Sequence, residues 1–517
     1  MPKHALTIDV LGCSLQISAD EEPEYLNNLL ETYKEKLEEI GKTTGLKDPT
    51  KIAILTGFIL CDEAKKNRAN IETQKTGTDE ETKEAENLTL NLISKLEDVL
   101  GIDETGKNEK EVFKLQNTIK HFDWGSPVLL PDLLGMENET GVPWAELWMG
   151  IHPEGPSAID LPNFSETGPE KKSILLSDLI SGNPDFFLGK NEKRFSTLPF
   201  LFKALAAGKP LSIQAHPNLP QAREGWEREN RDGIPLDSPH RNYKDANHKP
   251  EIICALTPFT AMAGFRQPDE IMELLGFFLE GASRDLKAAF FPLLNTLEEK
   301  EAPLKKFLAA LLALPRDIKT ALSVFAGQKA KADNSTNDEW KLIAAFAENF
   351  PGDPAIISPL YLNLVHLNPT EAIFIPAGIL HAYVEGLGVE LMANSDNVMR
   401  GGLTAKHIDI PELFRILDFE PYKPEILTEN KASGYHKYPV YCREFSLSVI
   451  RDRDFIYPET GPSIVLVTRG ELKISGKFRE TFLKKGETAF IPAKEKNFRF
   501  EGSYTLYAAG TGSVTEA

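Results

Sequence analysis

Residues 367–386, LNPTEAIFIPAGILHAYVEG, agree with residues 483–502, LKKGETAFIPAKEKNFRFEG, at 8 of 20 positions when the two are aligned without gaps. Both copies contain the run Phe-Ile-Pro-Ala. In each copy an apolar run ends at a Pro-Ala turn, and a second run with strand character follows. A repeated unit of strand, turn and returning strand is typical of jelly-roll sheets, so it predicts a mainly β protein.

The two copies differ at a position that matters for chemistry. The first copy has His381 where the second has Asn497. The second copy can therefore keep the architecture but not an imidazole ligand. We expect jelly-roll domains of the cupin kind, one of which holds a metal ion while the last is structural.

Two further polar clusters enter apolar runs upstream of the repeat. Residues 211–218, LSIQAHPN, read as a strand, in which Gln214 and His216 face the same side because strand side chains repeat every two residues. Lys249 and Glu251 likewise share a face in the run NHKPEII. Each cluster alone is a weak signal, because Gln-x-His arises by chance and a strand histidine is more often a hydrogen-bonded core residue than a ligand.

The clusters become informative in combination with His381. Gln214, His216, Glu251 and His381 supply a carboxamide oxygen, two imidazoles and one carboxylate. This set suits a borderline divalent ion such as zinc, with room left for water or substrate.

Composition limits the setting of this chemistry. A chain of 517 residues is expected to form several domains, and its net charge of −19 argues against nucleic acid as a partner. An anionic substrate would need its own local patch of Lys and Arg. The four cysteines have no C-x-x-C spacing, and neither a signal sequence nor a membrane-length apolar run is present. We expect a cytoplasmic chain with no membrane partner.

The first hundred residues differ from the rest of the chain in their pattern of apolar residues. Residues 5–17 alternate around Leu11-Gly12 and predict a short hairpin. Helices are predicted over residues 26–40, 48–71 and 88–99: the first is amphipathic, the second is apolar nearly all round from Ile52 to Cys61, and the third has one apolar face. These would form a small α+β domain with a coiled-coil-like helical segment. Two interpretations of its apolar helix surface stay open: burial against another chain, or a helical hairpin packed on its own protein.

The remainder of the chain divides by its periodicity. The spacing of apolar residues predicts strands over 113–266 and helices over 267–352. It predicts strands and turns again over 353–435 and 436–517. We expect an N-terminal cupin-like catalytic part, a helical insertion, a second part that completes the metal site, and a C-terminal structural cupin. The fold class is therefore mainly β, with cupin domains flanking a helical insertion.

The N-terminal hundred residues resemble the cell-division accessory family ZapA. The resemblance rests on the hairpin, the acidic helix start with Tyr25-Leu26, and the run from Lys51 to Leu55 that leads into Asp62-Glu63. It implies self-association into a homo-oligomer and a division-ring protein as a partner. It implies no chemistry.

Residues 113–517 resemble the type I mannose-6-phosphate isomerase family. The resemblance rests on ordered motifs at residues 119–126, 146–153, 198–203, 214–217, 248–251 and 397–404. It implies a zinc-dependent aldose–ketose isomerase, with one zinc ion per chain, that interconverts mannose 6-phosphate and fructose 6-phosphate through an enediol or enediolate.

The resemblance also implies roles for individual residues. The zinc ligands would be Gln214, His216, Glu251 and His381, the same four that the clusters nominate. Arg400 matches the catalytic arginine, and Lys203 and Lys249 would face the sugar phosphate. Less defined roles fall to Tyr383, Glu390 and Asp396.

The proton-transferring base is left open among three residues. His248, Glu390 and Asp396 can each take a proton near neutral pH if their surroundings tune them. We place His248 slightly ahead as a proton shuttle, and we treat His152 as structural.

Two rival functions stay open on the sequence alone. Two histidines and one glutamate on a cupin also form the facial site of iron oxygenases, although Gln214 and the cationic residues disfavour it. Alternatively, the first hundred residues make the chain a division-associated scaffold with a vestigial cupin, which the intact ligand set argues against.

Overall fold

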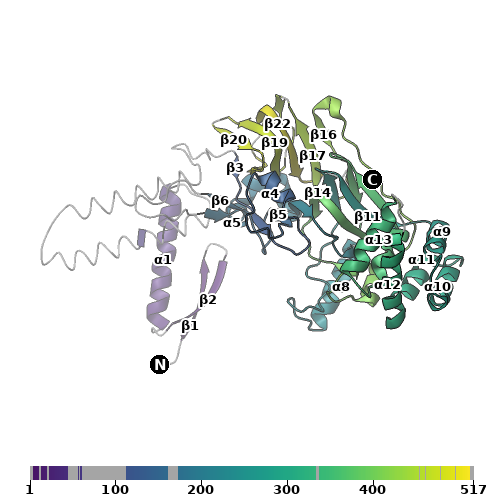
Figure 1. Cartoon of the computed structure of the whole chain (residues 1–517). Helices are drawn as coiled ribbons and strands as arrows, with labels where there is room; N and C mark the ends of the chain where they lie inside the picture. Colours follow the sequence, from purple (N-terminus) through teal and green to yellow (C-terminus); the bar gives the residue numbers. More distant parts are fainter. Residues whose placement is uncertain are drawn as a thin grey trace, which may run out of the picture. The chain divides into compact units, whose positions relative to one another are not determined.

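The computed structural model describes residues 4–10, 13–19, 23–44, 56, 59–60, 112–160, 173–332, 337–452, 454–459, 461–477, 479–494 and 497–512. It divides into two compact units, Met1–Glu109 and Lys110–Ala517 (Figure 1). Among the helices of these residues, none is long and apolar enough to cross a membrane.

The first unit contains a hairpin and a helix at the residues where the sequence predicts them. Strands β1 (His4–Val10) and β2 (Cys13–Ala19) pair antiparallel, and helix α1 (Pro23–Thr44) follows. Leu37 and Ile40 are buried, as expected for the apolar stripe of an amphipathic helix. Of the predicted second helix, only Thr56, Ile59 and Leu60 are described, as helix, and the predicted third helix lies outside the described residues.

The larger sheet of the second unit has ten strands in the described part of the chain. Its central path runs β12-β11-β14-β8-β5-β4, while β10, β13, β9 and β15 join beside it. The strands are β4 (Thr118–Lys120), β5 (Glu146–Met149), β8 (Phe200–Ala207), β9 (Ile213–Ala215), β10 (Glu251–Ala255), β11 (Phe259–Phe265), β12 (Leu362–Leu367), β13 (Ala372–Ile375), β14 (His381–Ala393) and β15 (Met399–Gly402).

A second, eight-stranded sheet lies at the C-terminal end of the described residues. Its strands are β3 (Phe113–Lys114), β16 (Tyr435–Lys437), β17 (Ser446–Arg451), β18 (Phe455–Ile456), β19 (Ser463–Ser475), β20 (Glu480–Lys484), β21 (Thr488–Ile491) and β22 (Arg499–Gly510). Strand β3 comes from the start of the unit and pairs with β21, so the chain enters the unit through its last sheet. A small pair, β6 (Ala158–Asp160) and β7 (Ser173–Leu175), stands apart.

The repeated sequence adopts matching structure in its two copies. Strand β21 occupies the positions in the second copy that β13 occupies in the first, and β22 follows as β14 does. The copies diverge where ligand chemistry would begin. His381 opens β14, whereas Asn497 precedes β22 with a left-handed φ of 63°. The mainly β architecture is consistent with the cupin fold.

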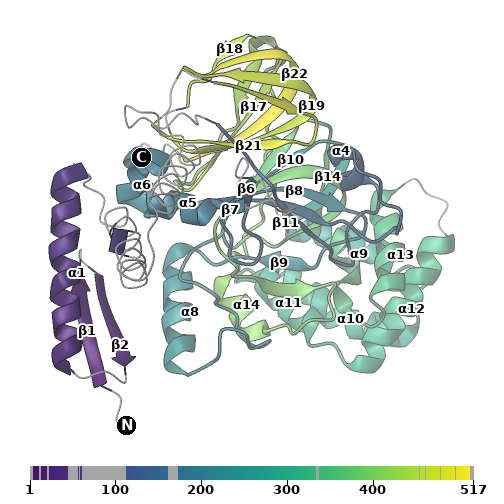
Figure 2. The ribbon, with the colours of Figure 1, turned by 90° about the vertical axis from the view of Figure 1, so that its left-hand side faces the viewer.

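Helices connect and cover the sheets. Those between β11 and β12 are α9 (Pro268–Phe278), α10 (Arg284–Leu297), α11 (Pro303–Leu312), α12 (Arg316–Ala332) and α13 (Asp338–Asn349), followed by the 3-10 helix Pro354–Leu360. The others are α4 (Leu129–Leu134), α5 (Leu176–Gly182), α6 (Pro184–Leu188), α7 (Glu192–Phe195), α8 (Leu219–Arg231) and α14 (Ile410–Ile416). In both views the larger sheet lies between the C-terminal sheet and α9–α13 (Figures 1 and 2).

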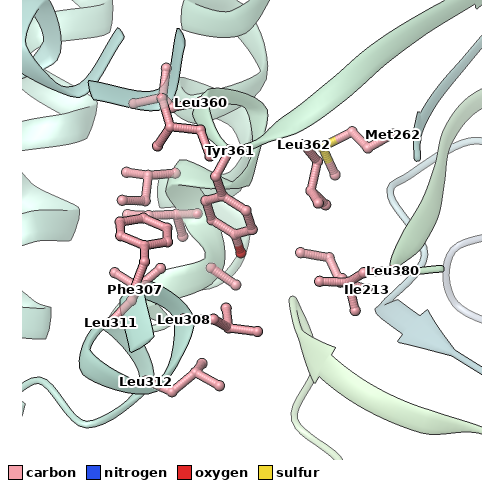
Figure 3. Close-up of a cluster of buried hydrophobic side chains, with 14 of the residues drawn as sticks. Ile213, Met262, Phe307, Leu308, Leu311, Leu312, Leu360, Tyr361, Leu362 and Leu380 are labelled. Atoms are coloured by element: carbon pink, nitrogen blue, oxygen red, sulfur yellow. The ribbon is translucent and has the colours of Figure 1, made fainter. Parts of the chain in front are cut away.

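A single hydrophobic cluster joins the helices to the larger sheet. Phe307 and Leu311 of α11 pack near Tyr361, while Ile213 and Met262 approach from the sheet side (Figure 3). All five are almost fully buried. Because Ile213 neighbours Gln214 on β9, this packing fixes the strand that carries a predicted ligand.

Gly264 in β11 is a position that only glycine can occupy without strain. Its φ is +71°, and a Cβ there would lie 2.1 Å from the carbonyl oxygen of Tyr422. Gly264→Ala should lower the free energy of unfolding by about 2–4 kcal/mol, from the left-handed backbone and the steric overlap together. Chemical denaturation followed by circular dichroism measures this.

The matched control is Gly276→Ala in the exposed part of α9, where a Cβ would meet no atom within 4 Å. That variant should be more stable by roughly 0.5–1 kcal/mol, because alanine favours the helix interior. Equal stabilities of the two variants would contradict the strain at Gly264.

Candidate metal centre

Three side chains from distant parts of the sequence meet inside the larger sheet. One ligand atom each of His216, Glu251 and His381 lies within 4.8 Å of the others, and all three residues are buried. His381 Nε2 lies 2.9 Å from Glu251 Oε1, and His216 Nε2 lies 3.5 Å from Glu251 Oε2. Among the described residues, no other group of three His, Cys, Asp or Glu side chains is so placed.

The strands place these residues at their ends. Glu251 opens β10 and His381 opens β14, whereas His216 follows the last residue of β9. The strand predicted over 211–218 is shorter than expected, with only Ile213–Ala215 paired. Its continuation is replaced by α8, because Asn218 caps that helix and forms a capping box with Gln221.

Gln214 joins the group through strand pairing. It is the cross-strand partner of His381 on β14 and of Arg400 on β15. Directly paired residues of antiparallel strands carry their side chains on one face. The strand pairing thus places Gln214 on the same face as His381, which belongs to the cluster with His216 and Glu251.

Backbone carbonyls fix the tautomer of both imidazoles. His216 Nδ1 donates to the carbonyl of Asn397 at 2.7 Å, and His381 Nδ1 donates to the carbonyl of Ile379 at 2.9 Å. A carbonyl oxygen only accepts, so both Nδ1 atoms carry a proton, and Nε2 of each ring is the nitrogen that faces Glu251. This is the usual arrangement of metal-binding histidines.

The protonation states also suit a cation. Burial and the neighbouring charge of Lys249 lower the pKa of His216 to about 4, so the imidazole is neutral at neutral pH. Burial alone would raise the pKa of Glu251, but the neighbouring ammonium of Lys249 is the largest of the effects that outweigh burial and hold that pKa well below its usual range. His381 Nε2 and Glu251 Oε2 form no hydrogen bond, although both are buried. Buried imidazole nitrogens turned toward an ionised carboxylate fit a divalent cation between them.

A cavity of about 480 Å³ opens beside the centre and is rich in positive charge. The cationic residues that line it are Lys203, Lys209, Lys249, Arg400 and Lys406, and the acidic ones are Asp123, Glu146 and Glu390. In a chain of net charge −19, this is the local patch that an anionic substrate requires.

Lys203 is held between two carboxylates at the wall of the cavity. Its Nζ lies 3.2 Å from Glu146 Oε1 and 3.0 Å from Glu390 Oε2. Burial by itself would lower the pKa of Lys203, but the two carboxylates outweigh it and raise the pKa. Trp148 Nε1 donates to the other oxygen of Glu146 at 2.7 Å, so the ammonium is charged and fixed in position.

Glu390 keeps more proton affinity than an ordinary carboxylate. Burial raises its pKa, and Lys203 offsets only part of that effect. It lines the cavity, as Arg400 does. A buried carboxylate with a raised pKa at the wall of a cavity matches the needs of a general base.

A β-bulge in β14 brings Glu390 to the same face as His381. Tyr383 pairs with Ala261, but Glu385 pairs with the adjacent Thr260, so β14 has one extra residue there. The bulge reverses the alternation of side chains along the strand. Glu390 therefore faces the site although it lies an odd number of positions from His381.

The remaining predicted residues are dispersed around the centre. The Tyr383 hydroxyl donates to Glu251 Oε1 at 3.0 Å and so orients the carboxylate. His248 Nε2 lies 3.1 Å from Glu444 Oε1, and Asp396 Oδ2 lies 3.0 Å from Nε2 of His152. Neither His248 nor Asp396 is among the residues that line the cavity, and their role in proton transfer stays a prediction.

Sequence reasoning missed several residues of the cavity wall, of which Asp123, Glu146, Lys209 and Lys406 carry charge. Glu146 gave a usable signal, because an acidic residue two positions from Trp148 on an apolar strand shares its face. Lys209 and Lys406 gave none, since nothing in their spacing separates them from surface lysines.

Each of the two units contains a match to a known protein family. Residues 112–268 match the model of the phosphomannose isomerase type I catalytic domain, and residues 6–99 match that of the cell division protein ZapA. The mannose-6-phosphate isomerase of Escherichia coli (strain K12) is 38% identical over 401 residues, which are 75% of this chain and 97% of that protein. Mannose-6-phosphate isomerase 1 of Arabidopsis thaliana is 32% identical over 437 residues, covering 78% of this chain and 95% of the relative.

Solved structures agree with these relatives. A crystal structure of a variant phosphomannose isomerase from Salmonella typhimurium has a TM-score of 0.70 and 34% identity, and covers 78% of this chain and all of that one. A zinc-bound mannose 6-phosphate isomerase has a TM-score of 0.70 and 35% identity over the same share. The chain therefore belongs to the type I mannose-6-phosphate isomerase family, and it carries a ZapA domain ahead of its catalytic region.

Proposed function

We propose that this chain interconverts mannose 6-phosphate and fructose 6-phosphate, with one zinc ion bound by Gln214, His216, Glu251 and His381. One observation carries the proposal: two imidazoles, each held at Nδ1 by a backbone carbonyl, turn Nε2 toward a buried carboxylate beside a cationic cavity. When bound, zinc supplies a Lewis acid that stabilises negative charge on sugar oxygens.

We assign the catalytic cupin to residues 113–266 and 353–435, and the structural cupin to 436–517. Strands β9, β10 and β14, which carry the nominated ligands or lead to them, all belong to the catalytic cupin. Residues 267–352 form the helical insertion between the two parts of the catalytic cupin. Asn349 and Phe350 line the cavity, so the end of this insertion contributes to the substrate site.

The phosphate of the substrate is assigned to the cations that line the cavity. Lys209 and Lys406 stand in its wall without being held between carboxylates as Lys203 is. Arg400 offers a planar, two-pronged donor that fits phosphate or enediolate oxygens. These residues bind and orient the substrate and attract it by charge.

The chain's own residues also move the proton. Moving a carbonyl between C1 and C2 requires a base that takes the proton from C2 of the aldose and returns it to C1. We assign this to Glu390, because it lines the cavity and its pKa is raised by burial. Lys203 holds the Glu390 carboxylate in place at 3.0 Å and balances its charge.

We further propose that the ZapA domain mediates self-association or recruitment to the division ring. The match to the ZapA model over residues 6–99 supports this, as do the hairpin and the amphipathic α1. The domain adds no metal-binding group among its described residues.

The decisive measurement is a coupled assay of the conversion of mannose 6-phosphate to fructose 6-phosphate. The full chain should be active, a chelator should remove the activity, and added zinc should restore it. A fragment beginning at Val112 should keep the activity but lose self-association in sedimentation. Bound iron with oxygen uptake and no sugar-phosphate turnover would instead support the oxygenase alternative.

His381→Ala should abolish isomerisation and stoichiometric zinc binding, because it removes a buried imidazole lone pair from the centre. Metal analysis and the coupled assay measure the two effects, and self-association should be unchanged. The control His366→Ala alters an exposed histidine of β12 and should behave as the unaltered chain. Full activity in His381→Ala would refute the site.

Glu390→Gln should lower kcat by about 10²- to 10⁴-fold while zinc binding persists, because the amide cannot accept the proton. The matched control Glu385→Gln changes an exposed carboxylate on the same strand and should have little effect. An unchanged kcat in Glu390→Gln would show that Glu390 is not the base. The kcat values of His248→Gln and Asp396→Asn would then show which of these two residues takes the proton.

A further inference from the structure

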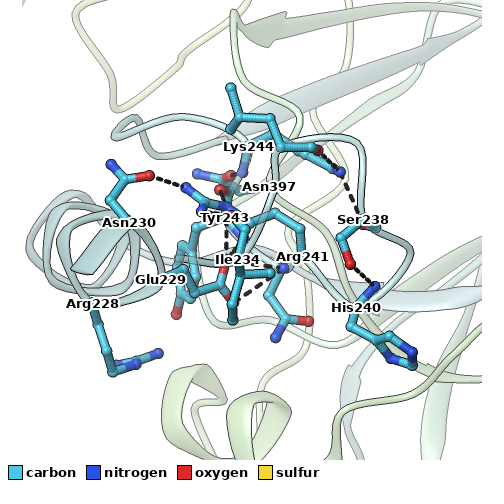
Figure 4. A network of polar contacts seen from close by, with 12 residues as sticks. Arg228, Glu229, Asn230, Ile234, Ser238, His240, Arg241, Tyr243, Lys244 and Asn397 are labelled. Carbon is cyan, nitrogen blue, oxygen red and sulfur yellow. Dashed lines mark hydrogen bonds and ion pairs between the residues drawn. The ribbon is translucent and has the colours of Figure 1, made fainter. Parts of the chain in front are cut away.

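Asn397 joins three segments of the chain: its own segment before β15, the segment with His216, and the loop before Lys249. It is fully buried, and it precedes β15, on which Arg400 lies three positions later. Its backbone carbonyl accepts the Nδ1 proton of His216 at 2.7 Å. Its side chain faces the loop that leads from α8 to Lys249 and Glu251 (Figure 4).

The carboxamide of Asn397 is saturated by that loop. Its Oδ1 accepts from the backbone N–H of Lys244 at 2.7 Å and of Asp245 at 3.3 Å. Its Nδ2 donates at 2.9 Å to the carbonyls of both Asp245 and Asn247. A carboxamide with two acceptor and two donor contacts to backbone has one orientation only.

A second set of contacts fixes the backbone of Asn397 itself. The Asn397 N–H donates to Ser395 Oγ at 3.3 Å, and that hydroxyl donates to Asp245 Oδ1 at 2.9 Å. Asp245 Oδ2 accepts from the N–H of Asp396 at 2.8 Å. The Asp245 carboxylate is thus occupied by donors, which makes this cluster a clamp and not a second cation site.

The farther part of the loop is held separately. Arg241 donates to the carbonyls of Tyr243 and Ile234 and to Asn230 Oδ1, and it pairs with Glu229 (Figure 4). The ammonium of Lys244 donates to the carbonyls of Leu236 and Ser238. The loop would therefore stay folded if only the Asn397 contacts were lost.

We propose that Asn397 is a positioning residue that fixes the His216 imidazole and joins its segment to the one that carries Lys249 and Glu251. The side-chain clamp holds the Asn397 carbonyl at the place where it orients His216 Nε2 toward Glu251. The inference rests on the proposed zinc site, and it concerns how that site is kept in shape before metal binds.

Asn397→Ala keeps the carbonyl but releases the clamp. Its affinity for zinc should fall by about 10- to 100-fold, the usual effect of losing a group that orients a metal ligand. Chelator competition on the purified full chain measures this, with circular dichroism to verify folding. The zinc concentration that half-restores activity should rise, while kcat at saturating zinc changes less, because all four ligands remain.

The matched control is Lys244→Ala. It removes the side-chain contacts of the same loop but keeps the backbone N–H that donates to Asn397 Oδ1. Its zinc affinity should stay within about twofold of the unaltered chain. Ser395→Ala is a second, milder test of the clamp, and the loss of its hydrogen bonds should lower zinc affinity by about fivefold.

The outcomes separate this inference from the proposed function. If the unaltered chain binds no zinc, the proposed function fails and this inference fails with it. If the unaltered chain binds zinc and both Asn397→Ala and Ser395→Ala match its affinity, only the positioning role is overturned. An equal loss of affinity in Lys244→Ala would also overturn it, because general loosening of the loop would then explain the effect.

Discussion

The site depends on one buried charge, the carboxylate of Glu251. An ionised carboxylate inside a protein is unfavourable unless cations and donors surround it. Lys249 supplies a cation at 3.4 Å and Tyr383 supplies a hydroxyl donor, while both histidines turn Nε2 toward it. A metal ion between these groups satisfies them all. The surrounding strands therefore have to hold Glu251, His216 and His381 within a narrow tolerance.

Strand β14 contributes most to holding these residues in position. It pairs with β8, β9, β10 and β11, and so it touches every strand that carries a nominated ligand. It also has His381 at its start and Glu390 near its end. The bulge after Tyr383 lets both side chains face inward, because one extra residue reverses the alternation. A regular strand of the same length would turn Glu390 to the other face.

The C-terminal sheet repeats the unit without a histidine at the position of His381. It keeps the strand, turn and returning strand of the first copy and packs a core of its own. At the position of His381 it has Asn497, in a left-handed conformation that asparagine tolerates. The strand and turn pattern specifies the architecture, whereas single side chains at the strand ends specify the metal centre.

Much of this protein was predictable from residue type and spacing. The repeat predicted the mainly β architecture, and Gln214, His216, Glu251 and His381 were nominated as ligands because strand alternation places such residues on one face. The length of β9 was overestimated, since the capping box at Asn218 was not weighed against the strand pattern.

Other features arose only from tertiary contacts. Glu146 meets Lys203 across paired strands, the bulge in β14 turns Glu390 inward, and Asn397 joins His216 to the loop before Glu251. The sequence by itself determined the repeated fold unit and nominated the ligand set, because strand alternation is a local pattern with a fixed period. The tertiary structure alone decided which charges face the cavity and which loop is clamped, because those contacts join residues far apart in the chain and depend on strand register.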